Sequence, residues 1–193
     1  EKKERDSIKY PNEAYFKNEN GLLPQIIAPH HQAREKAKKE KQELASYAIK
    51  IIMNSFFGVL ASPNCRYFNL KIANAITHFG QMIIKLTAKQ IEKSGHKVIY
   101  MDTDSVFIET NLEKSKADTL GKKIQLEINE FYNQYIKKDY KRKSFLELEF
   151  KKQYIALMLP ALRMKDKEET AAKKRYAGLV EKEGREELEI VGL

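Results

Sequence analysis

Residues 98–109 contain two short runs of β-branched and aromatic residues on either side of Asp102-Thr103-Asp104-Ser105. A chain that reverses at so short a turn places the two runs side by side, so the segment predicts a β-hairpin. If the backbone stays extended through Asp102 and Asp104, the two carboxylates lean to one side. Hard cations such as Mg²⁺ prefer carboxylate oxygens together with substrate phosphates. Asp102 and Asp104 are therefore candidate metal ligands, and the alternative is that they only shape a turn.

The composition favours a polyanionic partner. The chain has 193 residues, 42% of them hydrophobic, and a formal net charge of +9. An excess of positive charge suits nucleic acid, although it also serves solubility. The single cysteine, Cys65, forms no internal disulfide, which indicates a reducing, cytoplasmic setting. We expect no membrane partner, because we find no apolar run of spanning length.

The pattern of apolar residues and turn signals predicts an α+β fold with helices on one face of an antiparallel sheet. Residues 1–20 are expected to be a loose lead-in, followed by two helices that form an antiparallel hairpin. The expected helices are about 24–40, 43–60, 72–93 and 120–135; the expected strands after the hairpin are about 145–150, 153–159, 174–181 and 187–192, with an exposed loop at 163–172.

The two helices of the expected helical hairpin each carry a polar face. Three residues of the second helix are spaced i, i+4 and i+7, with Gly58 beside them to allow close approach of a ligand: Lys50, Asn54 and Phe57. On the first helix, Arg34 and Lys38 are also four residues apart. In an antiparallel pair these cations can converge on one anion such as a triphosphate. The alternative is a solvated charged surface.

Another basic run, Lys173-Lys174-Arg175-Tyr176, begins a predicted strand. Alternation along a strand puts Lys174 and Tyr176 on one face, and Lys173 and Arg175 on the other. Cations beside an aromatic ring suit a nucleic-acid backbone, whereas charge on an edge strand also protects the edge.

Taken in order, these segments resemble the signatures of the family B DNA polymerases called motif B, motif C and the Lys-x-Tyr motif. They are Lys50 to Gly58, Tyr100 to Ser105, and Lys173 to Tyr176. Gly21-Leu22-Leu23-Pro24 followed by Arg34 and Lys38 resembles the first fingers helix of that family. Ile51-Ile52-Met53-Asn54, Cys65-Arg66-Tyr67-Phe68 and Leu159 to Arg163 resemble its bacterial DNA polymerase II branch. The resemblance extends from about residue 15 to the end.

The resemblance implies a DNA-directed DNA polymerase, a nucleotidyltransferase in which a primer 3′-hydroxyl attacks the α-phosphate of a dNTP with the help of two Mg²⁺ or Mn²⁺ ions. It implies that Asp104, with Asp102 beside it, is the catalytic metal ligand. The other implied roles are triphosphate binding by Arg34, Lys38 and Lys50, base-pair contact by Asn54 and Phe57, DNA contact by Gly58, Lys173, Lys174, Arg175 and Tyr176, and an acidic palm residue at Glu149.

The resemblance also implies a domain organisation. After the lead-in, it assigns 21–61 to the fingers, 62–162 to the palm, 163–172 to an exposed loop and 173–193 to incomplete palm or thumb-proximal strands. The implied partners are primer-template DNA, dNTPs and, through regions outside this chain, a sliding clamp. The implied role is replication or repair in the cytoplasm, at the nucleoid.

Two departures from the family pattern matter. Phe57 stands where the family usually has Tyr, so we expect altered base-pair discrimination rather than lost activity. Motif A, which supplies another metal carboxylate, does not occur in these residues, so we expect the chain alone to be inactive. The alternative functions are a non-catalytic polymerase-derived DNA-binding or scaffolding subunit and, from another class, a nucleotide-binding signalling domain on a related sheet.

Overall fold

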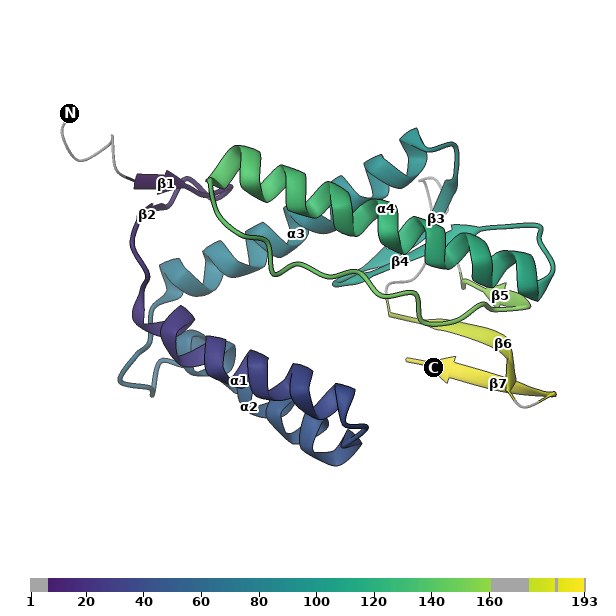
Figure 1. The fold of residues 1–193 in the computed structure, drawn as a ribbon, viewed down its shortest axis with the longest axis horizontal. Coiled ribbons are helices and arrows are strands. Elements are labelled where there is room, and N and C mark those ends of the chain that lie inside the picture. Colours follow the sequence, from purple (N-terminus) through teal and green to yellow (C-terminus); the bar gives the residue numbers. More distant parts are fainter. Residues whose placement is uncertain (1–6, 161–173, 183, 193) are drawn as a thin grey trace, which may run out of the picture. The chain divides into compact units, whose positions relative to one another are not determined.

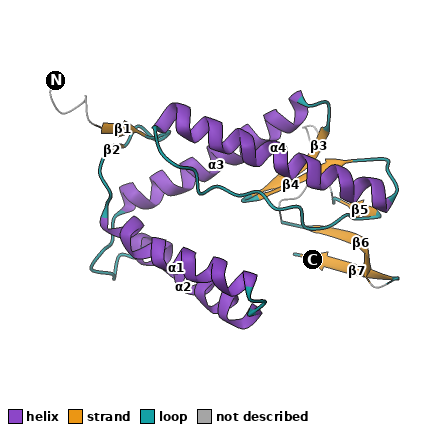
Figure 2. Ribbon diagram, viewed as in Figure 1, coloured by secondary structure: helices purple, strands orange, loops and turns teal. Residues whose placement is uncertain are grey.

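The computed structural model describes residues 7–160, 174–182 and 184–192 and has an α+β fold, which confirms the expected class (Figures 1 and 2). The expected loop at 163–172 and Lys173 lie outside the described residues. The elements in chain order are β1 (Ser7–Lys9), β2 (Tyr15–Lys17), α1 (Leu22–Lys39), α2 (Glu43–Ala61), α3 (Leu70–Lys93), β3 (Lys97–Asp102), β4 (Ser105–Glu109), α4 (Lys114–Tyr140), β5 (Ala156–Met158), β6 (Tyr176–Lys182) and β7 (Arg185–Val191).

The chain divides into two compact units, Glu1–Met82 and Ile83–Leu193. The division falls within α3, and the assignment of residues 21–61 and 62–162 to fingers and palm stays a prediction.

The first unit begins with a small hairpin, so the prediction of a loose lead-in is wrong for residues 7–17. β1 and β2 pair antiparallel, with Ser7 opposite Lys17. The turn closes through a hydrogen bond from the Tyr10 amide to the Ala14 carbonyl, at 2.8 Å. The Tyr10 ring also contacts Phe16, with ring centroids 4.5 Å apart. A pair of three-residue strands is marginally stable by itself, and this ring contact adds to its short ladder.

The predicted helical hairpin is confirmed as α1 and α2. Residues 40–42 join the helices, and Lys41 takes a left-handed conformation (φ 56°) that reverses the chain. The amide of Gln42 donates to the Ala37 carbonyl at 2.9 Å, which closes the end of α1. Ala37 is buried on α1 and Leu60 on α2. The remaining apolar surface of α2 is largely exposed, with Leu44 87% exposed.

One described helix, α2, is long and apolar enough to cross a membrane, so the expectation that no such run exists is wrong on length and composition. Its mean hydropathy over 18 residues is 1.5, and 11% of that window is buried. Lys50 and Asn54 lie in the middle of this helix, where a charged and an amide side chain are costly in hydrocarbon. Its exposed apolar surface therefore fits a contact with other protein or with ligand better than a membrane span.

In the second unit, the later turns of α3 pack against α4 around a buried hydroxyl pair. Thr87 has no exposed surface, and its hydroxyl donates to the Ile83 carbonyl at 2.8 Å. The Thr87 and Tyr132 hydroxyls also share a hydrogen bond, with Oγ1 and Oη 2.6 Å apart. Burial raises the pKa of Tyr132, and the Thr87 bond opposes the rise. The buried residues around this pair are Ile83, Ala88, Ile91, Ile124, Ile128 and Ile136.

The predicted strand at 145–150 is wrong: this stretch pairs with no strand within the part of the chain that the structure describes. It runs back along α4, as Figure 1 shows, and its backbone bonds to helix side chains. Asn129 accepts from the Leu148 amide and donates to the Leu148 carbonyl, and Gln125 accepts from the Phe150 amide. The Phe150 ring lies so near Gly121 that an added Cβ would be 2.3 Å from it. Alternating apolar residues here contact a helix instead of a sheet.

The strands of the second unit pair antiparallel in two ladders, β3 with β4 and β5 with β6 with β7. β3 and β4 match the predicted hairpin, with Asp102 opposite Ser105. β6 begins at Tyr176, two residues later than predicted, and pairs with β7 from Tyr176 opposite Val191 to Lys182 opposite Arg185. β5, the observed part of the expected 153–159 strand, pairs with β6. The two ladders meet through aromatic rings of the candidate site.

Candidate active site

The two candidate metal ligands lie in a two-residue turn, as predicted. Asp102 ends β3, and Thr103 and Asp104 form the reversal before Ser105. The Thr103 hydroxyl donates to Asp102 Oδ1 at 3.1 Å, and the Ser105 hydroxyl donates to Asp104 Oδ1 at 3.2 Å. Asp102 is half-buried and Asp104 is exposed. Both carboxylates therefore keep oxygens available to a cation.

The backbone does not stay extended through this carboxylate turn (Asp102–Ser105). Thr103 has φ 50°, the left-handed region, which a β-branched residue adopts at a cost of about 1–2 kcal/mol. The alternation argument for Asp102 and Asp104 therefore does not apply, and the reversal itself sets their directions. Such a turn persists only when its surroundings hold it.

An aromatic cluster of Tyr100, Phe107, Tyr154 and Tyr176 supplies that support. Tyr100, two residues before Asp102, is 8% exposed. Its ring centroid lies 5.4 Å from that of Phe107 and 6.3 Å from that of Tyr176. Phe107 stacks on Tyr154 at 6.0 Å. The cluster joins the β3–β4 hairpin to β6 and so fixes the turn against the second ladder.

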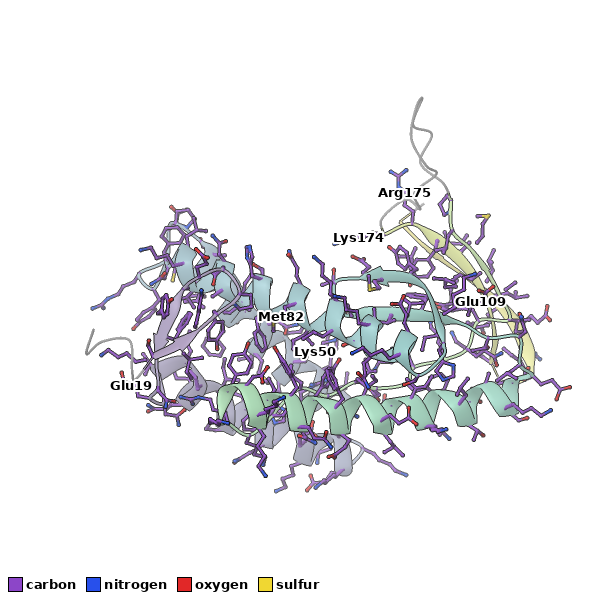
Figure 3. All side chains as sticks on the ribbon, turned by 90° about the horizontal axis from the view of Figure 1, so that it is seen from above. Glu19, Lys50, Met82, Glu109, Lys174 and Arg175 are labelled. Carbon is purple, nitrogen blue, oxygen red and sulfur yellow. The ribbon has the colours of Figure 1, made fainter. Side chains whose placement is uncertain are left out.

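Two cations of the basic run, Lys174 and Arg175, lie next to this aromatic cluster. The Lys174 amide donates to Tyr100 Oη at 2.7 Å, and Lys174 has φ 60°. The prediction that Lys174 lies in a strand is therefore wrong, because its backbone is left-handed and β6 starts at Tyr176. Lys174 and Arg175 are both exposed, where the chain enters β6 (Figure 3). Tyr176 is half-buried within the aromatic cluster.

Gly192 approaches the same backbone closely. It has φ 67°, and an added Cβ would be 2.0 Å from the Lys174 carbonyl oxygen. The end of β7 therefore packs against the start of β6 at the point where Lys174 is held.

Glu149 does not complete a three-carboxylate site with the turn. Within 7–160, 174–182 and 184–192, no three His, Cys, Asp or Glu residues form a group suited to a metal. Glu149 is exposed and pairs with Lys151, Oε2 to Nζ at 2.6 Å. The donors at the turn are carboxylate oxygens, which suit Mg²⁺ when phosphate oxygens and water complete its shell.

In the first unit, the helical hairpin forms a cavity of about 420 Å³ between α1 and α2. We call it the basic cavity. Its lining includes all three predicted triphosphate-binding residues, Arg34, Lys38 and Lys50. Lys50 is labelled in Figure 3. The prediction that the antiparallel helices bring these three cations together is confirmed, because all three line one cavity. Lys41 also lines the cavity.

Arg34 carries an unsatisfied donor in the basic cavity. Its Nε is buried and has no hydrogen-bond partner within the described part of the chain. A buried donor without an acceptor is unfavourable by about 1–3 kcal/mol, so an acceptor that reached it would stabilise the site. Lys38 instead pairs with Glu35, Nζ to Oε1 at 3.2 Å.

The remaining predicted residues of α2 lie beyond the basic cavity. Asn54, Phe57 and Gly58 are exposed and are not among its lining residues. Phe57 leaves 39% of its surface exposed, so its ring is available for stacking. No neighbouring atom lies within 4 Å of a Cβ added at Gly58.

Two residues that support the site were not predicted from the sequence. Lys41 lies in the link between helices, where its charge was not connected with the Arg34 and Lys38 face. Tyr100 belongs to the motif C segment, but nothing in the alternation pattern shows that its hydroxyl accepts from the backbone 74 residues away.

The sequence profile of DNA polymerase family B matches residues 4–192, and the chain belongs to that family. DNA polymerase II of Escherichia coli (strain K12) is 34% identical over 183 residues, which cover 94% of this chain and 23% of that protein. The DNA polymerase delta catalytic subunit of Candida albicans is 30% identical over 199 residues, 91% of this chain and 17% of that protein. The predicted resemblance is confirmed, and the chain spans less than a quarter of these relatives' length.

Proposed function

We propose that this chain supplies the dNTP-binding surface and part of the metal-binding centre of a DNA-directed DNA polymerase. The observation that carries the proposal is the basic cavity, where Arg34, Lys38 and Lys50 converge and the Arg34 Nε donor lacks a partner within the described residues. Family B membership gives this cavity its context.

The chemistry of the cavity suits a triphosphate. Arg34 offers a planar set of donors to two phosphate oxygens, and the lysines act as point charges. Lys38 exchanges its exposed partner Glu35 for phosphate at little cost, since exposed ion pairs contribute about 0–1 kcal/mol. Asn54 and Phe57, further along α2, contact the base pair being formed.

The carboxylate turn supplies metal ligands for the reaction. Asp104 and Asp102 would hold Mg²⁺ or Mn²⁺, which when bound activates the primer hydroxyl and stabilises the leaving pyrophosphate. The aromatic cluster keeps the turn in place while the exposed side chains of Lys174 and Arg175 contact phosphates of the primer-template. We extend this DNA-binding role to Lys173, Tyr176 and Gly58, and the acidic palm role to Glu149.

The cellular setting follows from the same proposal. The parent protein acts in replication or repair at the nucleoid, and a sliding clamp contacts it through regions outside this chain. The chain by itself adds no nucleotides, because the described residues offer only the two turn carboxylates to a two-metal centre.

Primer extension by the full-length protein that contains this chain tests the proposal. We expect Asp104→Asn to lower the rate at least 100-fold, because a metal ligand contributes several kcal/mol of transition-state stabilisation, about two or more powers of ten in rate. Asp118→Asn on α4, which removes the same charge away from the turn, should leave the rate within about two-fold. Full activity of the Asp104 variant would overturn the proposal.

A paired test addresses the basic cavity. Lys50→Ala should raise the KM for dNTP at least about ten-fold, since a hydrogen bond to a charged group is worth about 1.5–3 kcal/mol. Lys71→Ala, an exposed lysine of α3 in the same unit, is the matched control. Equal KM values for the two variants would count against triphosphate binding there.

A further inference from the structure

The C-terminal end of α4 carries a basic patch that the proposed function does not use. Six residues line an open cavity of about 830 Å³ there: Gln134, Lys137, Lys138, Lys141, Arg142 and Lys143. We call them the α4 patch. All of them lie in one ten-residue stretch of the second unit. Residues 134–143 contain five cations and one acidic residue, Asp139. The cavity is therefore strongly positive.

Stabilisation of the helix explains only part of this charge. Lys137 and Lys138 lie in the last turn of α4, where cations interact favourably with the helix dipole. Lys141 caps the helix in a left-handed conformation, and Lys143 lies two residues beyond the cap. No ion pair is formed by Lys137, Lys138 or Lys143 among the described residues. Their charge is accordingly available to an external anion.

An exposed aromatic ring accompanies the cations. Phe145 leaves 70% of its surface exposed, and Lys143 Nζ lies 5.6 Å from its ring centroid. Hydrophobic burial does not account for a ring in this position. Cations that follow a phosphate backbone, next to an aromatic face on which a base stacks, are the usual composition of a surface for unpaired nucleic acid.

The α4 patch is also separate from the carboxylate turn along the fold. β4 leads from the turn to α4, and the patch begins about 30 Å along this 27-residue helix. From the charge, the open cavity and the exposed ring, we propose that the α4 patch and Phe145 bind a single-stranded nucleic acid at a site distinct from the dNTP-addition centre.

Binding of fluorescent dT₁₂ to the 193-residue chain, followed by anisotropy over a range of salt concentrations, tests this proposal. Lys137→Gln, Lys138→Gln and Lys143→Gln are combined in one variant. The control combines Lys85→Gln, Lys89→Gln and Lys93→Gln, three exposed lysines of α3 in the same unit. The patch variant should bind at least ten-fold more weakly at low salt, and its log–log salt slope should shrink by about 2, near 0.7 for each lost phosphate contact. The control should stay within about two-fold of wild type.

A second variant separates stacking from charge. Phe145→Ala should weaken dT₁₂ binding about five-fold or more and leave the salt slope unchanged. A duplex of equal length should bind more weakly than dT₁₂ to wild type and should not respond to Phe145→Ala. Matching melting temperatures by circular dichroism would show that each variant is folded. Equal losses in the patch and control variants, an unchanged affinity of the patch variant, or unchanged binding by Phe145→Ala would each overturn the proposal, and an unchanged patch variant would point to an acidic protein as the occupant.

Discussion

The carboxylate turn of the second unit and the basic cavity of the first differ in whether their hydrogen-bonding groups have partners within the protein. Beside the turn, Tyr100 accepts a backbone hydrogen bond, and its ring contacts two other rings. In the basic cavity, Arg34 keeps a buried donor without a partner in the described residues. The turn is held by the protein itself, whereas one donor of a cavity residue is left without a partner by the described residues.

The largest expected effect is on the packing of the aromatic cluster. A Cβ added at Gly178 would lie 2.2 Å from the Tyr154 ring, so Gly178→Ala should destabilise the chain by about 1–3 kcal/mol through overpacking. Gly80→Ala is the same change in an open position of a helix and should stabilise by about 0.5–1 kcal/mol. Urea unfolding measures both. If both substitutions stabilise the chain, the aromatic cluster accommodates a Cβ at Gly178 without overpacking.

The next effect concerns the bond that joins Tyr100 to Lys174. Tyr100→Phe keeps the ring contacts but leaves the Lys174 amide without its acceptor, so we expect a loss of about 0.5–1.5 kcal/mol. Tyr67→Phe, an exposed tyrosine of the first unit, serves as the comparison and should change stability by less than about 0.5 kcal/mol. If thermal unfolding shows no difference between the two variants, the aromatic cluster is not fixed through this bond.

In the first unit, Gly58→Ala should raise the stability of the chain and lower the affinity of the full-length protein for primer-template DNA. Its Cβ would meet no atom within 4 Å, so helix propensity should add about 0.5–1 kcal/mol. If Gly58 allows close approach of DNA, the affinity of the full-length protein for primer-template should fall. Gly80→Ala should stabilise by a similar amount without that loss, and a Gly58 variant with full affinity would remove Gly58 from the DNA surface.

The smallest effect is electrostatic and depends on pH. The Lys152 ammonium, with Tyr154 and Lys182, holds the pKa of Glu189 below its ordinary value of 4.5. A lowered carboxyl pKa adds stability above the ordinary pKa, and this stability is lost as pH falls through the folded value. Glu189→Gln should therefore cost about 1 kcal/mol or less at pH 7, since solvent screens this half-buried group in part. The difference from wild type should vanish in acid, and a gap that widens below pH 4.5 would contradict this sign.

The sequence predicted the elements that depend on local patterns. The hairpin at 98–109, the helical pair and the convergence of Arg34, Lys38 and Lys50 follow from alternation, helical spacing and a short link. The strand assigned to 145–150 was wrong because Phe145 to Phe150 alternate like a strand, while their backbone partners are the Asn129 and Gln125 side chains of α4. That choice of partner depends on tertiary packing, which a pattern does not contain.

Backbone conformation set the other limits. Lys174 and Thr103 both take positive φ values, although neither is a residue type that favours them. Each lies beside the aromatic cluster, whose contacts join segments distant in sequence. The β1–β2 hairpin was missed because strands of three residues carry too short a pattern to stand out from a polar lead-in.

The most direct test of the central claim is dNTP binding by the full-length protein after removal of the unsatisfied donor. Arg34→Met should weaken dNTP binding at least about ten-fold by calorimetry, because charge-assisted hydrogen bonds are lost. Its melting temperature without ligand should rise, since the substitution removes a buried donor that has no partner within the described residues. Arg66→Met, the same change at an exposed position of the first unit, should leave both values unchanged. Unaltered dNTP affinity in the Arg34 variant would contradict the account.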